Sequence, residues 1–121
     1  MHHIDIHVHS TEATRRLLAA FMPLVGYEVR SDDDTFVSYW KDRRRPAIGF
    51  ITDDTRDGAS GMMRLAFSVG SNAEVDAVGT AIRDAGAREI DGPAFYPEYE
   101  ADYYAVFFED ASGNKFEVCR T

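Results

Sequence analysis

The chain has 121 residues, of which 45% are hydrophobic and 28% charged, and its formal net charge is -8. This length and balance predict one globular domain spanning residues 1–121 and exclude a disordered or fibrous chain. The negative charge excludes a nucleic-acid partner, which requires clustered Lys and Arg, and no apolar run approaches the roughly 20 residues that span a membrane.

The cysteine content and the one basic segment bear on location and partners. A single cysteine, Cys119, leaves no intramolecular disulfide to form, and we expect no signal peptide. A cytoplasmic location is therefore the default expectation. The basic run at residues 41–45 is interrupted by Asp42 and followed by Pro46, so we expect a solvated loop between strands rather than a binding patch.

The first half of the chain is expected to form a strand, a helix and three more strands. The opening strand, residues 3–8, alternates strictly between an apolar and a polar face. The polar face carries His3, Asp5, His7 and His9. His2 would point to the opposite face if the strand began that early. A helix follows at residues 10–22, with an apolar stripe of Leu17, Leu18, Phe21 and Met22. Strands are then expected at residues 27–30, 35–40 and 47–52.

The second half repeats this order after a polar loop at residues 53–61. A strand is expected at residues 64–69, and Ser71 with Glu74 forms a capping box that opens a helix. This helix ends at Gly86. Its inward-facing residues are expected to be Val75, Val78, Ile82 and Ala85. Three further strands are expected at residues 87–90, 103–109 and 115–119.

The two halves match in spacing as well as in order. Residues 3–26 and residues 64–86 each run from a strand through one helix to a glycine. Each half alone would leave one face of its sheet bare, and pairing the halves buries it. We therefore expect an α+β domain of two repeated strand-helix-strand-strand-strand units, at residues 1–55 and 61–121. An unrelated α+β sandwich with coincidental spacing is the alternative.

Three segments carry a resemblance to a known family: residues 3–8, residues 64–69 and residues 107–118. The last segment is the most informative, because it joins an aromatic strand, a turn and a strand that carries a Glu. In the turn, Asp110 can accept hydrogen bonds from the backbone and Gly113 can take a positive φ. On these residues the chain resembles the vicinal-oxygen-chelate superfamily, the glyoxalase/bleomycin-resistance/dioxygenase-like proteins.

The resemblance implies a cupped mixed sheet with helices on its convex face and a divalent metal in its concave face. The metal-ligand positions of the family correspond to His3, Gly49, Arg64 and Glu117. Only His3 and Glu117 can bind a metal, because glycine has no side chain and arginine is a permanent cation. Two protein ligands fall short of the three that are usual at a catalytic metal. We therefore expect no cofactor, with a divalent metal on His3 and Glu117 as the alternative.

The other polar residues of the first strand do not complete a metal site. His7 lies four residues from His3, roughly 13 Å along a strand, which is too far to share one ion. Asp5 lies about 7 Å from His3 along the strand and is a marginal ligand. We favour a polar wall of a ligand cavity, formed in part by Asp5 and His7, over metal binding.

Arg64 has two interpretations, and both can hold in one protein. It forms an ion pair with Glu117, the guanidinium taking the place of the metal. Alternatively, it anchors an anionic ligand such as a carboxylate in the cavity. We prefer the ion pair, because Glu117 would otherwise be a buried and unpaired charge whenever no ligand is bound.

Aromatic residues provide further candidates for ligand contacts. The loop at residues 92–102 resembles the segment that closes over the cup in relatives, where Tyr99 or Tyr103 would stack on a ligand or donate a hydrogen bond. Trp40 is expected either in the core or in the cavity wall. Cys119 shares the face of Glu117, and a lone cysteine is more often a small buried apolar residue than a nucleophile.

Three functions remain open at this point. The first is a lyase or isomerase resembling lactoylglutathione lyase, or a dioxygenase of the same superfamily, with Glu117 as general base or metal ligand. The second is a binding module that sequesters a small anionic molecule in the sheet cavity, and the third is a structural or regulatory domain. Losing two metal-ligand positions favours the second and third. The resemblance also implies a homodimer.

Overall fold

The computed structural model describes residues 1–8, 11–51 and 64–120. The loop expected at residues 53–61 and the expectations for His9 and Ser10 fall outside these ranges. Within the described residues, no helix is long and apolar enough to cross a membrane.

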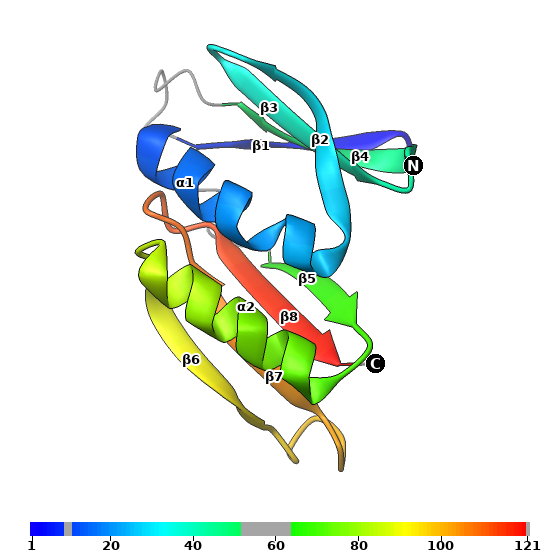
Figure 1. Ribbon diagram of the computed structural model, residues 1–121, viewed down its shortest axis with the longest axis vertical. Coiled ribbons are helices and arrows are strands. Elements are labelled where there is room, and N and C mark those ends of the chain that lie inside the picture. The colour runs from blue at the N-terminus through cyan, green and yellow to red at the C-terminus, as the bar shows by residue number, and fades with distance from the viewer. Residues whose placement is uncertain (9–10, 52–63, 121) are drawn as a thin grey trace.

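The elements follow the predicted order (Figure 1). The first half contains β1 (His3–His7), α1 (Thr11–Phe21), the 3-10 helix η1 (Pro23–Val25), β2 (Tyr27–Asp33), β3 (Phe36–Lys41) and β4 (Arg44–Ile51). The second half contains β5 (Arg64–Val69), α2 (Asn72–Asp84), β6 (Arg88–Phe95), β7 (Tyr104–Glu109) and β8 (Lys115–Arg120). This repeated order confirms the predicted α+β class with two similar units, whereas the exact repeat boundaries stay a prediction.

Each unit forms a mixed sheet of its own. Sheet A has the strand order β1-β4-β3-β2 and sheet B the order β5-β8-β7-β6. In both sheets the first strand of the unit runs parallel to the last one, while the remaining pairs are antiparallel. The described strands therefore do not close into a barrel, and each sheet has one face against the helices and one face turned away from them, here called the outer face.

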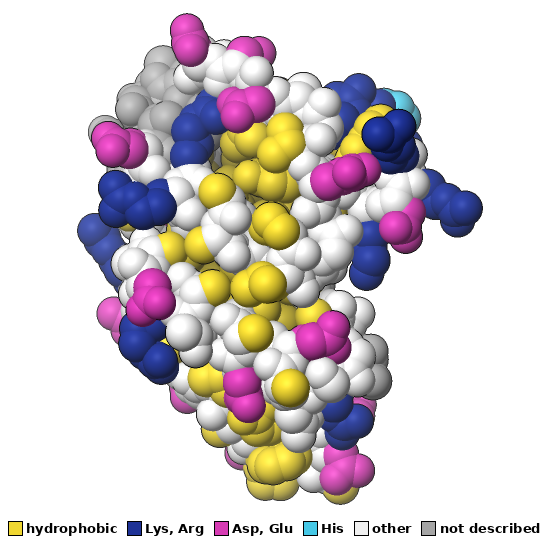
Figure 2. Space-filling model, in the orientation of Figure 1, with side chains coloured by type: hydrophobic (Ala, Val, Ile, Leu, Met, Phe, Trp, Pro, Cys, Tyr) yellow, Lys and Arg dark blue, Asp and Glu magenta, His cyan; other side chains and the backbone are white. Residues whose placement is uncertain are grey.

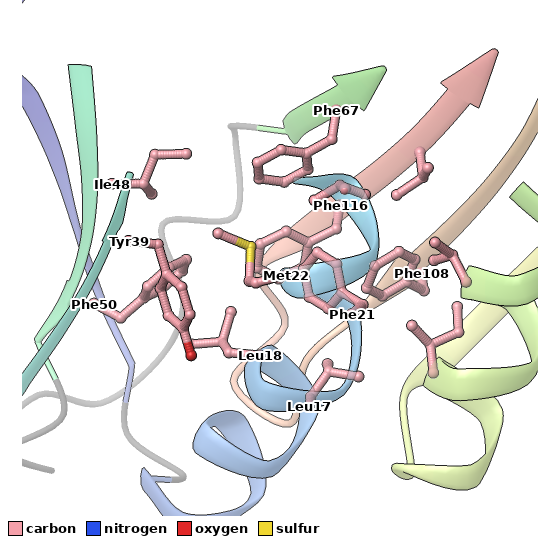
Figure 3. Close-up of a cluster of buried hydrophobic side chains, with 14 of the residues drawn as sticks. Leu17, Leu18, Phe21, Met22, Tyr39, Ile48, Phe50, Phe67, Phe108 and Phe116 are labelled. Carbon is pink, nitrogen blue, oxygen red and sulfur yellow. The ribbon is translucent and has the colours of Figure 1, made fainter. Parts of the chain in front are cut away.

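The core lies between the two sheets and the helices (Figure 3). Phe21 of α1 is fully buried, with its ring centroid 5.0 Å from that of Phe108 and 5.5 Å from that of Phe116. Leu18 of the same helix and Met22, which directly follows the helix, point toward the side of sheet A that carries Phe50. Helix α1 thus contributes apolar surface to both sheets at once, which holds the two units together.

Helix α2 covers sheet B, and the capping box at its start is confirmed. The Ser71 hydroxyl accepts a hydrogen bond from the backbone N–H of Glu74 at 3.2 Å. The Glu74 carboxylate accepts one from the backbone N–H of Gly70 at 2.9 Å. One backbone donor left free at the helix start, and one just before the N-cap residue, are satisfied in this way. The apolar side chains predicted to face inward include Val75, Val78 and Ile82, which are fully buried.

The turn between β7 and β8 also has the predicted chemistry. The carboxylate of Asp110, which is fully buried, accepts hydrogen bonds from the backbone N–H groups of Ser112 and Asn114, both at 2.9 Å. Gly113 takes a φ of 85°, in the left-handed region where a side chain would be strained. The turn that carries the family resemblance is therefore intact.

Two segments differ from the expected loops. In the basic run at residues 41–45, only Asp42 and Arg43 form a turn, and Arg45 belongs to β4. Strand β6 runs on to Phe95, although the strand was expected to end at Ile90. Pro93 is tolerated within β6 because this strand is the edge of sheet B, where a missing N–H leaves no ladder bond unmade.

Candidate ligand-binding site

The outer face of sheet A holds a cavity of about 230 Å³. Three small residues on its central strands belong to the lining: Ser38 of β3, and Ala47 and Gly49 of β4. The bulkier lining residues are His2, His3, Asp5, Arg30, Phe36 and Arg45. We call this the sheet A cavity. It is the natural place for a small ligand, because it combines apolar walls with convergent polar groups.

The histidines and the carboxylate of the cavity lie side by side. Nε2 of His3 is 3.4 Å from Oδ2 of Asp5, and Nδ1 of His2 is 2.9 Å from Nδ1 of His3. The condition under which His2 would point to the opposite face, a strand that begins before His3, is not met. Strand β1 begins only at His3, so the strand alternation does not extend to His2.

Two arginines give the cavity its positive charge. Among the described residues, neither Arg30 nor Arg45 forms an ion pair, whereas Arg15 and Arg43 pair with carboxylates. The charge of Arg45 lowers the pKa of His2 below its ordinary value of 6.5, with smaller effects of burial, His3 and Arg30.

Figure 2 shows Lys, Arg and His side chains gathered on the side of the molecule where the N-terminus and β4 lie. The guanidinium of Arg30 lies over the ring of Trp40, 5.3 Å from its centroid. Trp40 therefore stands beside the cavity, where it orients Arg30.

The described residues do not fit a divalent metal at the family's position in sheet A. A Cβ atom added to Gly49 would lie 2.3 Å from Oδ1 of Asp5 and 2.6 Å from the ring of Phe36. These two side chains therefore occupy the space that a ligating side chain at position 49 would need. Among the described residues, no group of three or more His, Cys, Asp and Glu side chains could hold a metal ion.

A second polar cluster lies on the outer face of sheet B. The hydroxyl of Tyr103 donates a hydrogen bond to Oε1 of Glu117, whose residue is only 7% exposed. Burial, together with this hydrogen bond, raises the pKa of Tyr103 well above its ordinary value. Burial also raises the pKa of Cys119, which lies beside them and is a free, buried thiol. At neutral pH this cysteine is therefore protonated, consistent with a structural role.

The preferred interpretation of Arg64 is wrong. Its guanidinium lies over the ring of Phe107, 4.9 Å from the centroid, and the side chain is exposed. No ion pair joins it to Glu117 in the part of the chain that the structure describes. The partner of Glu117 is instead the hydroxyl of Tyr103, and the spacing of the sequence did not predict this contact. Tyr99 is 59% exposed and packs its ring 5.4 Å from that of Tyr103.

The candidate residues thus divide between the two sheets. The sheet A cavity brings together His3 and Asp5, with Trp40 beside it. On sheet B the candidates are Arg64, Tyr99, Tyr103 and Glu117. His7 is on the polar face of β1 but is not among the described cavity residues, and its buried Nδ1 has no hydrogen-bond partner within the described part of the chain.

Sequence reasoning missed the two arginines of the cavity. Arg45 lies four residues before Gly49 on β4, so strand alternation from Gly49 would have placed it on the same face. Arg30 carried no such signal, because the register of β2 against β3 shifts between Val29 and Ser31. A bulge of this kind re-aims a side chain in a way that alternation cannot anticipate.

Comparison with known proteins gives one sequence relative and several structural ones. No family model matches the chain. The uncharacterized protein YqjT of Bacillus subtilis is 30% identical over 124 residues, covering 98% of this chain and 96% of its own length. The chain is therefore similar to YqjT over nearly its entire length.

The solved structures show the fold. A glyoxalase/bleomycin resistance protein of Albidiferax ferrireducens superposes with a TM-score of 0.75 at 21% identity, over 100% of this chain and 98% of its own. A glyoxalase-related enzyme of Fulvimarina pelagi superposes with a TM-score of 0.76 at 18% identity, over 100% of this chain and 87% of its own. A lactoylglutathione lyase of Agrobacterium tumefaciens superposes with a TM-score of 0.62 at 17% identity, over 99% of this chain and 92% of its own. The chain therefore belongs to the family of YqjT, and its two repeated units have the fold of the glyoxalase and bleomycin-resistance proteins.

Proposed function

We propose that the protein is a binding module that holds a small anionic molecule in the sheet A cavity and needs no metal ion to do so. The observation that carries this proposal is the pair of cavity arginines, Arg30 and Arg45, which have no ion-pair partner among the described residues. Unpaired guanidinium groups around a concave surface favour a carboxylate or another oxyanion, to which arginine can donate two parallel hydrogen bonds.

The charge distribution of the whole chain sharpens this argument. The net charge is -8, so a positive site on this protein is opposite in sign to the charge of the chain as a whole. The cavity arginines are the source of that local positive charge, as their effect on His2 indicates. An anion would therefore be attracted to this face and repelled by most of the remaining surface.

Two observations support binding without a metal: the space around Gly49 is filled, and Glu117 already has a hydrogen-bond partner. Asp5 and Phe36 fill the position from which a ligating side chain would approach. Glu117 lies on the other sheet and already accepts a hydrogen bond from Tyr103. An anion held by arginines needs neither group as a metal ligand.

The proposal is tested by titrating succinate into the metal-stripped protein and its variants in a calorimeter. Arg30→Gln and Arg45→Gln should each weaken binding by about 10-fold, the size of one charge-assisted hydrogen bond. Arg43→Gln is the matched control, because it removes the same charge from the same sheet but from an arginine paired with Glu28. Binding that is equally strong in all four proteins, or that requires added Zn(II), would overturn the proposal.

An enzyme remains the second candidate, either a lyase or isomerase or a dioxygenase. It is favoured by Glu117, a buried carboxylate with a tyrosine hydroxyl as its partner, which is a suitable general base. The likeness to the lactoylglutathione lyase of Agrobacterium tumefaciens also supports it. This candidate predicts a metal on His3 and Glu117 at near one per chain, so elemental analysis of untagged protein separates the two proposals.

We also propose that the protein is a homodimer. Phe95 and Tyr99 support this, because they are 56% and 59% exposed and large apolar side chains of this kind are often covered by a partner. Light scattering coupled to gel filtration tests it, and a monomer at working concentrations would contradict it. The cytoplasmic location stays a prediction that cell fractionation would test.

A further inference from the structure

Among the described residues that line the sheet A cavity, one is negatively charged, Asp5. The charged lining of the cavity consists of Arg30, Arg45 and Asp5, with His2 and His3 as titratable neighbours. Oδ2 of Asp5 is engaged by His3 at 3.4 Å. For Oδ1 of Asp5, no described residue donates a hydrogen bond. This oxygen lies close to Gly49, because a Cβ atom added there would be 2.3 Å from it, and both residues line the cavity.

The position of Asp5 creates a conflict for a simple anion. A carboxylate bound by the arginines would share a small cavity with the Asp5 carboxylate, and like charges at short range repel each other. The repulsion is relieved if the ligand places a hydrogen-bond donor between its own anionic group and Asp5. Such a donor would also satisfy the free Oδ1, because an ionised carboxylate is an acceptor only.

We propose that the ligand of the sheet A cavity carries a hydroxyl or ammonium group close to its anionic group, and that this donor binds Oδ1 of Asp5. The ligand class is therefore the small hydroxy- or aminocarboxylates. This inference rests on the proposed function, because it assigns a second contact to an anion that Arg30 and Arg45 already hold.

The size and walls of the cavity agree with this class. A volume of about 230 Å³ accommodates on the order of eight water-sized groups, which is enough for a short-chain acid and too little for a peptide. Phe36 and Ala47 supply apolar contacts for its carbon chain. Polar recognition at both ends with a short apolar middle also explains why the lining mixes charged, apolar and small residues.

Three four-carbon acids provide a matched set of probes for this inference. Succinate, malate and aspartate share two carboxylates and differ only by a hydrogen, a hydroxyl or an ammonium group at one carbon. In the wild-type protein, malate or aspartate should bind about 10-fold more tightly than succinate, the size of one net hydrogen bond to a charged group. In Asp5→Ala the three acids should bind with equal affinity, and succinate should bind better than it does to the wild type because the repulsion is gone.

Asp5→Asn keeps an acceptor oxygen but removes the charge, so it separates the two donors. A hydroxyl should retain much of its advantage in this variant, whereas an ammonium should lose most of it. It also serves as the second variant if Asp5→Ala fails to fold, as judged by circular dichroism.

Two results overturn the inference in different ways. If wild-type protein binds succinate as tightly as malate and aspartate, the donor contact is absent while the proposed anion site stands. If none of the three acids binds, the proposed function fails and this inference fails with it. A preference for malate or aspartate that persists unchanged in Asp5→Ala would likewise refute the assignment of Asp5.

Discussion

Removing the hydroxyl of Tyr103 tests how the protein stabilises the buried carboxylate of Glu117. In Tyr103→Phe, Glu117, which is 7% exposed, loses the one hydrogen-bond donor that the described structure gives it. Leaving a buried acceptor unsatisfied costs about 1–3 kcal/mol, and we expect about 2 kcal/mol here. For a domain of this size, that loss corresponds to a decrease in Tm of roughly 8 °C.

The assay is thermal and urea unfolding at neutral pH, with Tyr99→Phe as the matched control. Tyr99 belongs to the same aromatic group, but it is 59% exposed, and among the described residues its hydroxyl forms no hydrogen bond. Removing the Tyr99 hydroxyl should change the free energy of unfolding by less than about 0.5 kcal/mol. A double-mutant cycle with Glu117→Gln should give a coupling energy of about 1–2 kcal/mol. Equal stability of the Tyr103 and Tyr99 variants, with no coupling to Glu117, would refute this reasoning.

Three further predictions concern space, the turn and alkaline pH. Gly49→Glu should lose about 1–3 kcal/mol of stability through overpacking against Asp5 and Phe36, and calorimetry should detect no gain of Zn(II) binding. Asp110→Ala should lose about 2–3 kcal/mol in urea unfolding, because two buried backbone N–H groups lose their acceptor. Burial, aided by the charge of Asp32, raises the pKa of Tyr39 above its ordinary value of 10.0. The stability that the protonated hydroxyl contributes is therefore complete below pH 10.0 and is lost as the pH rises through the raised pKa. Tyr39→Phe should therefore reduce the fall in Tm between pH 9 and 11, and an unchanged fall would contradict this assignment.

The fold could be predicted because its signals are local and periodic. Alternation in β1, the capping box of Ser71 and Glu74, and the turn at Asp110 each depend on residues within a few positions of one another. The repeated element order then predicted that the two units pack together, because each sheet has an apolar face to bury. These signals do not depend on how the side chains of distant segments meet.

The site could be predicted only in part, because its contacts join separate strands. Asp5 and His3 were placed on the cavity wall from the parity of one strand. The partner of Glu117 was not, because the choice between Arg64 and Tyr103 depends on how β5 and the start of β7 sit on the two sides of β8. Arg30 was hidden by the bulge in β2, which no spacing rule reports.

The central claim is that the outer face of sheet A binds an anion without a metal, and mapping of backbone amide shifts tests it most directly. Metal-stripped, isotope-labelled protein would be titrated with succinate and followed by NMR. The account predicts that the shifts concentrate on β1, on the start of β4 around Arg45, and on Arg30. Shifts that concentrate instead around Arg64 and Glu117 on sheet B, or that arise only after Zn(II) is added, would contradict it.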